Sequence, residues 1–143
     1  MTLLPPTAMS PDAPESPPRL RRSWRDKFRA AFRGLKLGIR GHSSFSIHFF
    51  FTALVLAAAI AFRCGVLEWC VLLGCIGMVL TAELFNSAVE TLVRGLDETT
   101  QARVWPCLDI AAGAVLLASI AAAVIGSIIF LLKLADFFDW LPP

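Results

Sequence analysis

The sequence predicts an all-α integral membrane protein with three transmembrane helices preceded by an amphipathic surface helix. Three observations lead to this prediction. The 143-residue chain is 57% hydrophobic with a mean hydropathy of +0.69, which is too apolar for a soluble protein of this size. Nine of its 13 Lys and Arg residues lie between Arg19 and Arg40. Apolar stretches long enough to span a membrane follow that basic block.

A chain of this length has room for one domain, so no separate soluble catalytic domain is expected beside the spans. Any chemistry must therefore take place at the membrane face. The four cysteines show neither CxxC spacing nor a pattern of His and Cys metal ligands. We interpret them as small apolar residues in or near helices, with a Cys64–Cys70 disulfide as the lesser alternative.

Residues 1–18 contain six of the nine prolines and few apolar side chains. A segment of this composition does not bury enough surface to order itself, so we expect a disordered Pro-rich tail. It has neither the basic start nor the apolar middle of a signal peptide, and we do not interpret it as one.

The segment 19–40 predicts a basic amphipathic helix on the membrane surface. Apolar side chains recur along it at helical spacing: Trp24, Phe28, Phe32, Leu35 and Ile39. Basic side chains occupy the other faces, which suits an anionic inner leaflet and predicts a cytoplasmic N-terminus. Nucleic-acid binding is the weaker interpretation, because an aromatic stripe that runs directly into a span fits lipid better. We expect no nucleic-acid partner.

The first two spans are predicted at about residues 45–62 and 69–93. The first offers about eighteen residues with few polar interruptions. The second loses its charge-free character after Ala82, fourteen residues beyond its start at Trp69. That length covers about 21 Å of a hydrocarbon core of roughly 30 Å. We therefore expect the second helix to continue to about Val93 and to carry polar residues at its inner end.

Residues 94–107 are predicted to form a polar loop on the same side as the N-terminus, with Pro106 at the start of the third span. That span is expected over about residues 109–132, with a C-terminal tail at 134–143. Ala, Gly and Ser are frequent along it, and such small residues allow helices to pack closely. Since three helices alone make a thin bundle, we expect copies of the chain to associate.

A polar stripe ends the second span. Glu83, Asn86 and Glu90 are offset by 0, 3 and 7 residues, which brings them within about 60° of one another on a helix. A carboxylate where a membrane core gives way to water is costly unless it is paired, metal-bound or facing a wet cavity. The stripe is therefore a candidate site, and the alternative is a solvated extension of a transmembrane helix.

These residues also resemble a known family. Residues 27–130 are similar to the small bacterial membrane lipid kinases, the prokaryotic diacylglycerol kinase and undecaprenol kinase family. The family signature Glu-x-x-Asn-[Ser/Thr]-Ala-[Ile/Val]-Glu is present as Glu83, Asn86, Ser87, Ala88, Val89 and Glu90. A second signature, Lys-Asp followed by small residues, corresponds to Leu108, Asp109 and residues 110–115. The segments 28–34 and 46–50 resemble the family's surface helix and the start of its first span.

The resemblance implies a homotrimer in the bacterial inner membrane, with active sites between neighbours on the cytoplasmic side. It implies phosphoryl transfer from ATP, with Mg²⁺, to the hydroxyl of diacylglycerol or undecaprenol. By position Glu83 would be the general base and Asn86 a polar positioning group. Glu90 would bind the metal, and Asp109 would help to hold the nucleotide or to order the inner end of the third helix. The chain has no Gly-rich Walker loop, as the family implies.

Three positions depart from the family pattern. His42 stands where the family has a metal-binding glutamate, and Mg²⁺ prefers oxygen ligands. Leu108 replaces a lysine that would neutralise phosphate charge. Arg94 replaces an aspartate and lies four residues after Glu90, where the two can pair. Either Arg94 or Arg103 supplies the lost phosphate contact, or the Glu90–Arg94 pair takes the metal's place and nucleotide binds poorly.

The leading hypothesis is thus an ATP-dependent kinase of a membrane lipid. The alternative, favoured by the three departures, is a catalytically silent oligomeric homologue that acts as a scaffold. A small transporter subunit ranks last, because the spans offer little polar continuity. We interpret His48 as a polar residue at headgroup level. The expected site comprises catalytic Glu83 and Asn86, cofactor-binding Glu90, Asp109 and Arg94, and metal-binding Glu90 and His42.

Overall fold

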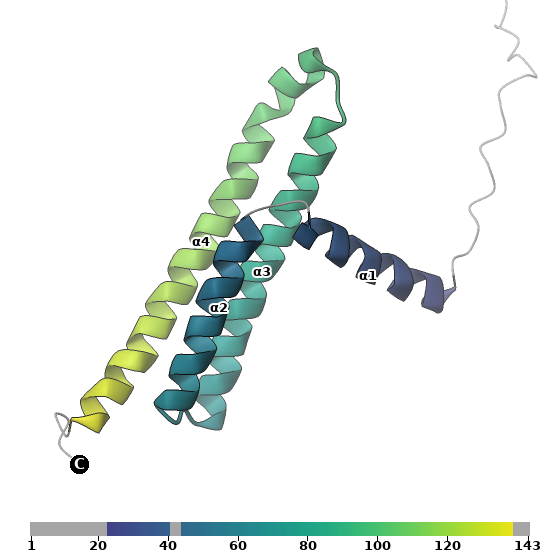
Figure 1. Ribbon diagram of the computed structural model, residues 1–143. Coiled ribbons are helices and arrows are strands. Elements are labelled where there is room, and N and C mark those ends of the chain that lie inside the picture. Colours follow the sequence, from purple (N-terminus) through teal and green to yellow (C-terminus); the bar gives the residue numbers. More distant parts are fainter. Residues whose placement is uncertain (1–22, 41–43, 139–143) are drawn as a thin grey trace, which may run out of the picture.

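The computed structural model describes residues 23–40 and 44–138, which form four α-helices (Figure 1). In chain order these are α1 (Trp24–Arg40), α2 (Ser44–Ala61), α3 (Val66–Arg94) and α4 (Glu98–Phe137). The all-helical prediction is confirmed, since the described ranges contain no strand. The predicted disordered tail at 1–18 and the metal-binding role of His42 both fall outside the described residues.

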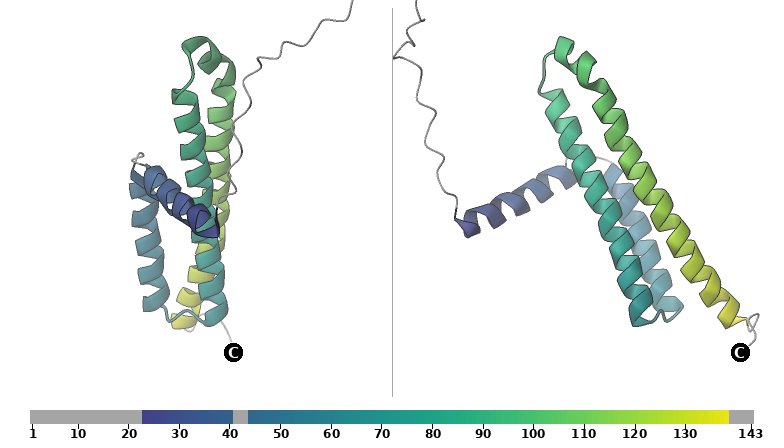
Figure 2. Two further views of the ribbon diagram at one scale, coloured as in Figure 1. Left: turned by 90° about the vertical axis from the view of Figure 1, so that its right-hand side faces the viewer. Right: turned by 180° about the vertical axis from the view of Figure 1, so that it is seen from behind.

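The helices α3 and α4 are each long and apolar enough to cross a membrane. The helices α1 and α2 reach that standard only when taken together, as a pair bent by 98°. Two or three spans are therefore consistent with the structure, against the three predicted. Figure 2 shows α2, α3 and α4 running along the bundle while α1 projects sideways from it, and α3 and α4 extend beyond the start of α2.

The predicted polar loop over 94–107 is wrong, because α4 begins at Glu98. Asp97 caps this helix: its side chain accepts the Thr100 backbone N–H at 3.1 Å and the Thr100 hydroxyl at 2.7 Å. These hydrogen bonds, the one from the hydroxyl first, hold the pKa of the Asp97 carboxyl below its usual value. Pro106 lies inside the helix instead of at its start. The prediction placed the helix start at Pro106 because proline favours the first turn of a helix. The side chain of Asp97, which caps the helix, determines where it begins.

Replacing Asp97 by Ala is expected to lower the thermal midpoint of the detergent-solubilised protein, because the Thr100 N–H loses its acceptor. Asp97→Ser is the matched control, since a hydroxyl can also cap a helix, and it should stay close to wild type. The folded pKa of Asp97 is depressed, so its contribution is present above the unfolded-state pKa and disappears as the pH falls through the folded value. Equal midpoints for the Ala and Ser variants would contradict the capping role.

The apolar side chains of the described residues are mostly exposed. The buried ones are few: Phe45, Ala59, Leu72, Cys75, Val93 and Ala118. Large exposed apolar side chains occur on all four helices, for example Phe50, Leu73 and Leu117. A soluble protein rarely exposes so much contiguous apolar surface, whereas a lipid-facing helix does. All four cysteines carry free thiols, so the Cys64–Cys70 disulfide is not formed.

An ion pair joins α3 to α4 at the end of the bundle where α2 turns into α3 (Figure 1). Lys133 Nζ lies 3.0 Å from Glu68 Oε2, and the same oxygen accepts the Gly65 backbone N–H at 2.6 Å. The Glu68 carboxylate thus caps the start of α3 and holds α4 beside it. This anchor lies at the opposite end of α3 from the polar stripe.

The helix α1 crosses α3 at Leu84. A Cβ added at Gly38 would collide with the Leu84 side chain, whereas a Cβ added at Gly34 would meet nothing within 4 Å. The missing side chain at Gly38 therefore allows the two helices to approach closely. Because α1 is the predicted surface helix, this contact marks the level on α3 at which we expect the membrane boundary.

The two glycines provide a matched test of this contact. Both substitutions to Ala improve intrinsic helix propensity by up to about 1 kcal/mol. We expect Gly34→Ala to raise the thermal midpoint and Gly38→Ala to lower it or leave it unchanged, because only the second must displace Leu84. Adding Leu84→Ala should relieve the Gly38→Ala variant. The same rise for both single variants would show that α1 does not pack against α3.

Candidate active site

The polar stripe of α3 is the most buried polar part of the described chain. The exposed fraction is 3% for Glu83, 9% for Asn86 and 1% for Ser87. The hydroxyl oxygen of Ser87 has no hydrogen-bond partner among the described residues. Burial of polar groups in a bundle that exposes most of its apolar side chains does not fit a solvated helix extension. The part of the stripe from Glu83 to Ser87 is therefore built into the protein interior.

Glu83 faces His48, which lies near the start of α2. His48 Nε2 is 3.7 Å from Glu83 Oε2, and the two side chains are 20% and 4% exposed. This contact connects α2 to α3 just beside the crossing of α1 at Leu84. The sequence interpretation of His48 as a headgroup-level residue missed this partner. A titratable side chain about one turn inside an apolar span was the signal that could have found it.

Glu90 is the centre of a second polar group, two turns further along α3. Its Oε1 accepts a hydrogen bond from Asn86 Nδ2 at 3.0 Å, and its Oε2 accepts one from Arg94 Nη2 at 2.9 Å. The Glu90–Arg94 pairing expected from the spacing is thus present. Seven residues separate Glu83 from Glu90, which corresponds to a rise of about 10 Å. The stripe consequently has a carboxylate at each end, Glu83 and Glu90, and the exposed guanidinium of Arg94 lies beyond Glu90.

The geometry at Glu90 does not form a ready divalent-metal site. Both carboxylate oxygens already accept N–H donors, from Asn86 and Arg94. Within the described ranges, no three His, Cys, Asp or Glu residues lie close enough together to hold a metal ion. His42, the other predicted ligand, lies outside those ranges. Mg²⁺ requires several oxygen ligands in near-octahedral geometry, which this arrangement does not offer.

Asp109 is separate from this group. It lies exposed on α4, and its side chain makes no hydrogen bond or ion pair with another described residue. Leu108, at the position of the expected lysine, brings no charge to the same stretch of α4. The structure therefore brings together Glu83, Asn86, Glu90 and Arg94 along α3, and it does not join Asp109 to them.

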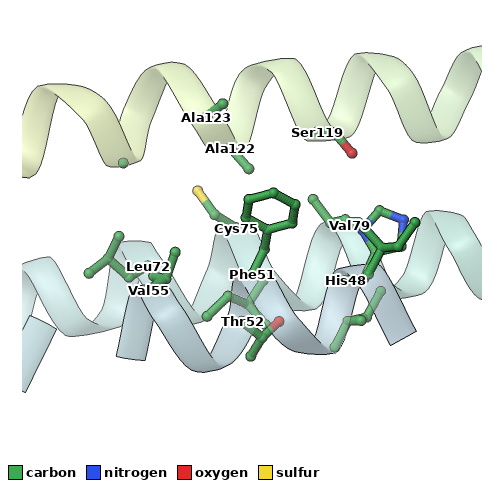
Figure 3. Close-up of a pocket in the computed structure, with 14 residues that line it drawn as sticks. His48, Phe51, Thr52, Val55, Leu72, Cys75, Val79, Ser119, Ala122 and Ala123 are labelled. Carbon is green, nitrogen blue, oxygen red and sulfur yellow. The ribbon is translucent and has the colours of Figure 1, made fainter. Parts of the chain in front are cut away.

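A cavity of about 340 Å³ lies between α2, α3 and α4, and Figure 3 shows its lining. Apolar side chains such as Phe51, Val55 and Leu72 form most of the wall. His48 lines the cavity too, and its imidazole connects the cavity to Glu83. The wall on α4 consists of small residues at offsets of 0, 3, 4 and 7: Ser119, Ala122, Ala123 and Gly126. The small side chains on this face leave space between α4 and the helices α2 and α3.

The chain was also compared with known proteins. Residues 29–130 match the family model described as prokaryotic diacylglycerol kinase. A relative named undecaprenol kinase, from Bacillus subtilis (strain 168), is 30% identical over 104 residues, which is 73% of this chain and 85% of the relative. No solved structure is matched. The matched residues include the whole polar stripe, His48 and the cavity wall.

Proposed function

Because the chain belongs to the prokaryotic diacylglycerol kinase family, we propose that it transfers the γ-phosphoryl group of ATP to the hydroxyl of a membrane lipid. The acceptor is diacylglycerol, which gives phosphatidic acid, or undecaprenol, which gives undecaprenyl phosphate. The observation that carries this proposal is a carboxylate, Glu83, that is 3% exposed and faces His48, a residue that lines an apolar cavity between helices. A lipid with its apolar chain in that cavity would place its polar end near His48 and the Glu83 carboxylate that His48 faces.

Glu83 acts as the general base in this proposal. Its carboxylate accepts the proton of the lipid hydroxyl while the hydroxyl oxygen attacks the γ-phosphorus of ATP. The bond between the γ-phosphorus and the bridging oxygen breaks, and its electron pair leaves on ADP. The low exposure of Glu83 supports this role, because a base shielded from water does not activate water in place of the lipid.

Asn86, Glu90 and Arg94 form the nucleotide side of the site. Arg94 is 65% exposed at its side chain and presents its guanidinium beyond Glu90, where it can bind a phosphate oxygen. Asn86 holds Glu90 from the other side. We propose that Arg94 replaces the charge absent at Leu108, and that Asp109 orients the nucleotide from α4. The family implies Mg²⁺, but the residues around Glu90 do not fit a preformed metal site, and we assign no step to a metal there.

We further propose a homotrimer in the bacterial inner membrane, with α1 on the cytoplasmic face. The basic residues of α1 support this orientation. The many exposed apolar side chains of α2, α3 and α4 support both lipid contact and association of copies. A catalytically silent scaffold stays the alternative, which the comparisons do not favour. Its support in the structure is the Glu90–Arg94 ion pair, because Arg94 binds the carboxylate that a metal would use.

The substrate is tested by a direct comparison of the two lipids. Purified protein in mixed micelles would be given γ-labelled ATP with Mg²⁺ and either diacylglycerol or undecaprenol, and kcat/KM would be measured for each. We expect label to enter at least one lipid, and the lipid with the higher kcat/KM is the substrate. Label in neither lipid, from protein that is folded and oligomeric by size-exclusion chromatography, would favour the scaffold.

A further inference from the structure

His48 and Glu83 form a pair that the family resemblance did not indicate. His48 Nε2 faces Glu83 Oε2 at 3.7 Å, a separation longer than a hydrogen bond and within the range of an ion pair. The two residues lie on different helices, so their proximity depends on the packing of α2 against α3. Both side chains are mostly buried, and His48 also lines the interhelical cavity.

A buried carboxylate needs a hydrogen-bond donor or a positive charge beside it to offset the loss of hydration. Glu83 is 3% exposed, and moving an unpaired carboxylate out of water costs several kcal/mol. His48 is the single polar side chain that pairs with Glu83 among the residues that the structure describes. Asn86 lies on the same stripe but donates to Glu90. The imidazole of His48 is thus the side chain that offsets the free-energy cost of burying the Glu83 carboxylate.

We propose that His48 is a positioning residue for Glu83, whose Nε2–H donates to Oε2 and leaves the other carboxylate oxygen to accept the lipid proton. Hydrogen bonds of catalytic groups are often long without substrate and shorten when substrate binds. We interpret the 3.7 Å between His48 Nε2 and Glu83 Oε2 as such a long separation, which shortens when the lipid binds. In this arrangement His48 does not touch the phosphate, and it acts on the reaction through Glu83. The kinetic part of this inference rests on the proposed function.

The pairing itself is tested without turnover. The chain has two histidines, so ¹⁵N-histidine labelling of the intact protein in bilayers gives signals from two imidazoles, and His42→Gln assigns them. We expect Glu83→Gln to shift the His48 Nε2 resonance, because the charged acceptor is lost. Glu98→Gln, an exposed carboxylate at the start of α4, should leave that resonance in place. A His48 resonance that is the same in wild type and Glu83→Gln overturns the proposal.

The positioning role is tested by kinetics. We expect His48→Ala to lower kcat by about 10- to 100-fold, as a base displaced by about 1 Å would, with the KM for ATP unchanged. His48→Gln should recover much of this loss, because its side-chain N–H can reach the same carboxylate. Ser46→Ala, an exposed position on the same helix, should retain wild-type kcat.

A double mutant separates positioning from a general structural role. If His48 acts through Glu83, adding His48→Ala to Glu83→Gln has no further effect on kcat. If His48→Ala lowers kcat by the same factor in wild type and in Glu83→Gln, the proposal is overturned. It is also overturned if His48→Ala lowers the thermal midpoint enough to explain its loss of kcat and His48→Gln does not restore that midpoint. Wild-type protein that labels no lipid would refute the proposed function, and the resonance shift would still decide the pairing.

Discussion

Glu83→Gln is expected to lower kcat for lipid phosphorylation by about 10²- to 10⁴-fold, the usual contribution of a general base. The amide has nearly the shape of the carboxylate and cannot accept the hydroxyl proton. The burial of Glu83 and its proximity to His48, which lines the cavity, make this the largest effect that we expect of any single substitution. The measurement is the initial rate of labelled phosphate transfer to the preferred lipid at saturating ATP.

Two controls accompany this variant. Glu98→Gln removes an exposed carboxylate from the first turn of α4 and should leave kcat unchanged. Size-exclusion chromatography should show that Glu83→Gln assembles like wild type, because an isosteric amide keeps the packing of α3. If Glu83→Gln phosphorylates lipid at the wild-type rate, Glu83 is not the base.

Arg94→Ala is expected to raise the KM for ATP by about 10- to 100-fold, the equivalent of one charge-assisted hydrogen bond to phosphate. The guanidinium is exposed and is held toward Glu90 at 2.9 Å, and the apolar Leu108 carries no charge that could replace it. The measurement is the ATP dependence of lipid phosphorylation. Arg63→Gln removes a positive charge at the opposite end of the bundle and should leave the KM unchanged.

The opposite result for Arg94 would have a clear meaning. If the Glu90–Arg94 pair blocks the nucleotide side, removing the guanidinium frees Glu90, and the KM for ATP should fall instead of rise. Arg94→Asp, which introduces the residue of the family pattern, should then be the most active variant. A fall in KM for either variant would contradict the phosphate-binding role of Arg94.

Local features of the fold were predictable from the sequence. Apolar stretches predicted α2 and α3 to within a few residues, because helix formation there depends on neighbours along the chain. The Glu90–Arg94 pair followed from a spacing of four residues on one helix. The start of α4 was wrong because two local signals competed, and the cap at Asp97 determined the helix start instead of the proline at Pro106.

Contacts between helices were not predictable in the same way. The pairing of His48 with Glu83 depends on the rotation and depth of α2 against α3, and no spacing within one helix encodes either quantity. The same is true of the crossing of Gly38 over Leu84 and of the cavity beside Ser119. Glu83 was identified as a candidate from its polarity, its place on the helical stripe and the family signature, but its partner required the structure.

The most direct test of lipid phosphorylation at Glu83 uses the mixture of lipids that a bacterial membrane provides. Purified wild-type protein and Glu83→Gln would each be incubated with γ-labelled ATP, Mg²⁺ and a total bacterial lipid extract, and the organic phase would be separated by chromatography. Lipid phosphorylation at Glu83 predicts a labelled phospholipid or polyprenyl phosphate with wild type and almost none with Glu83→Gln. Label that stays in the aqueous phase with folded wild-type protein, or that enters lipid equally with both, would contradict it.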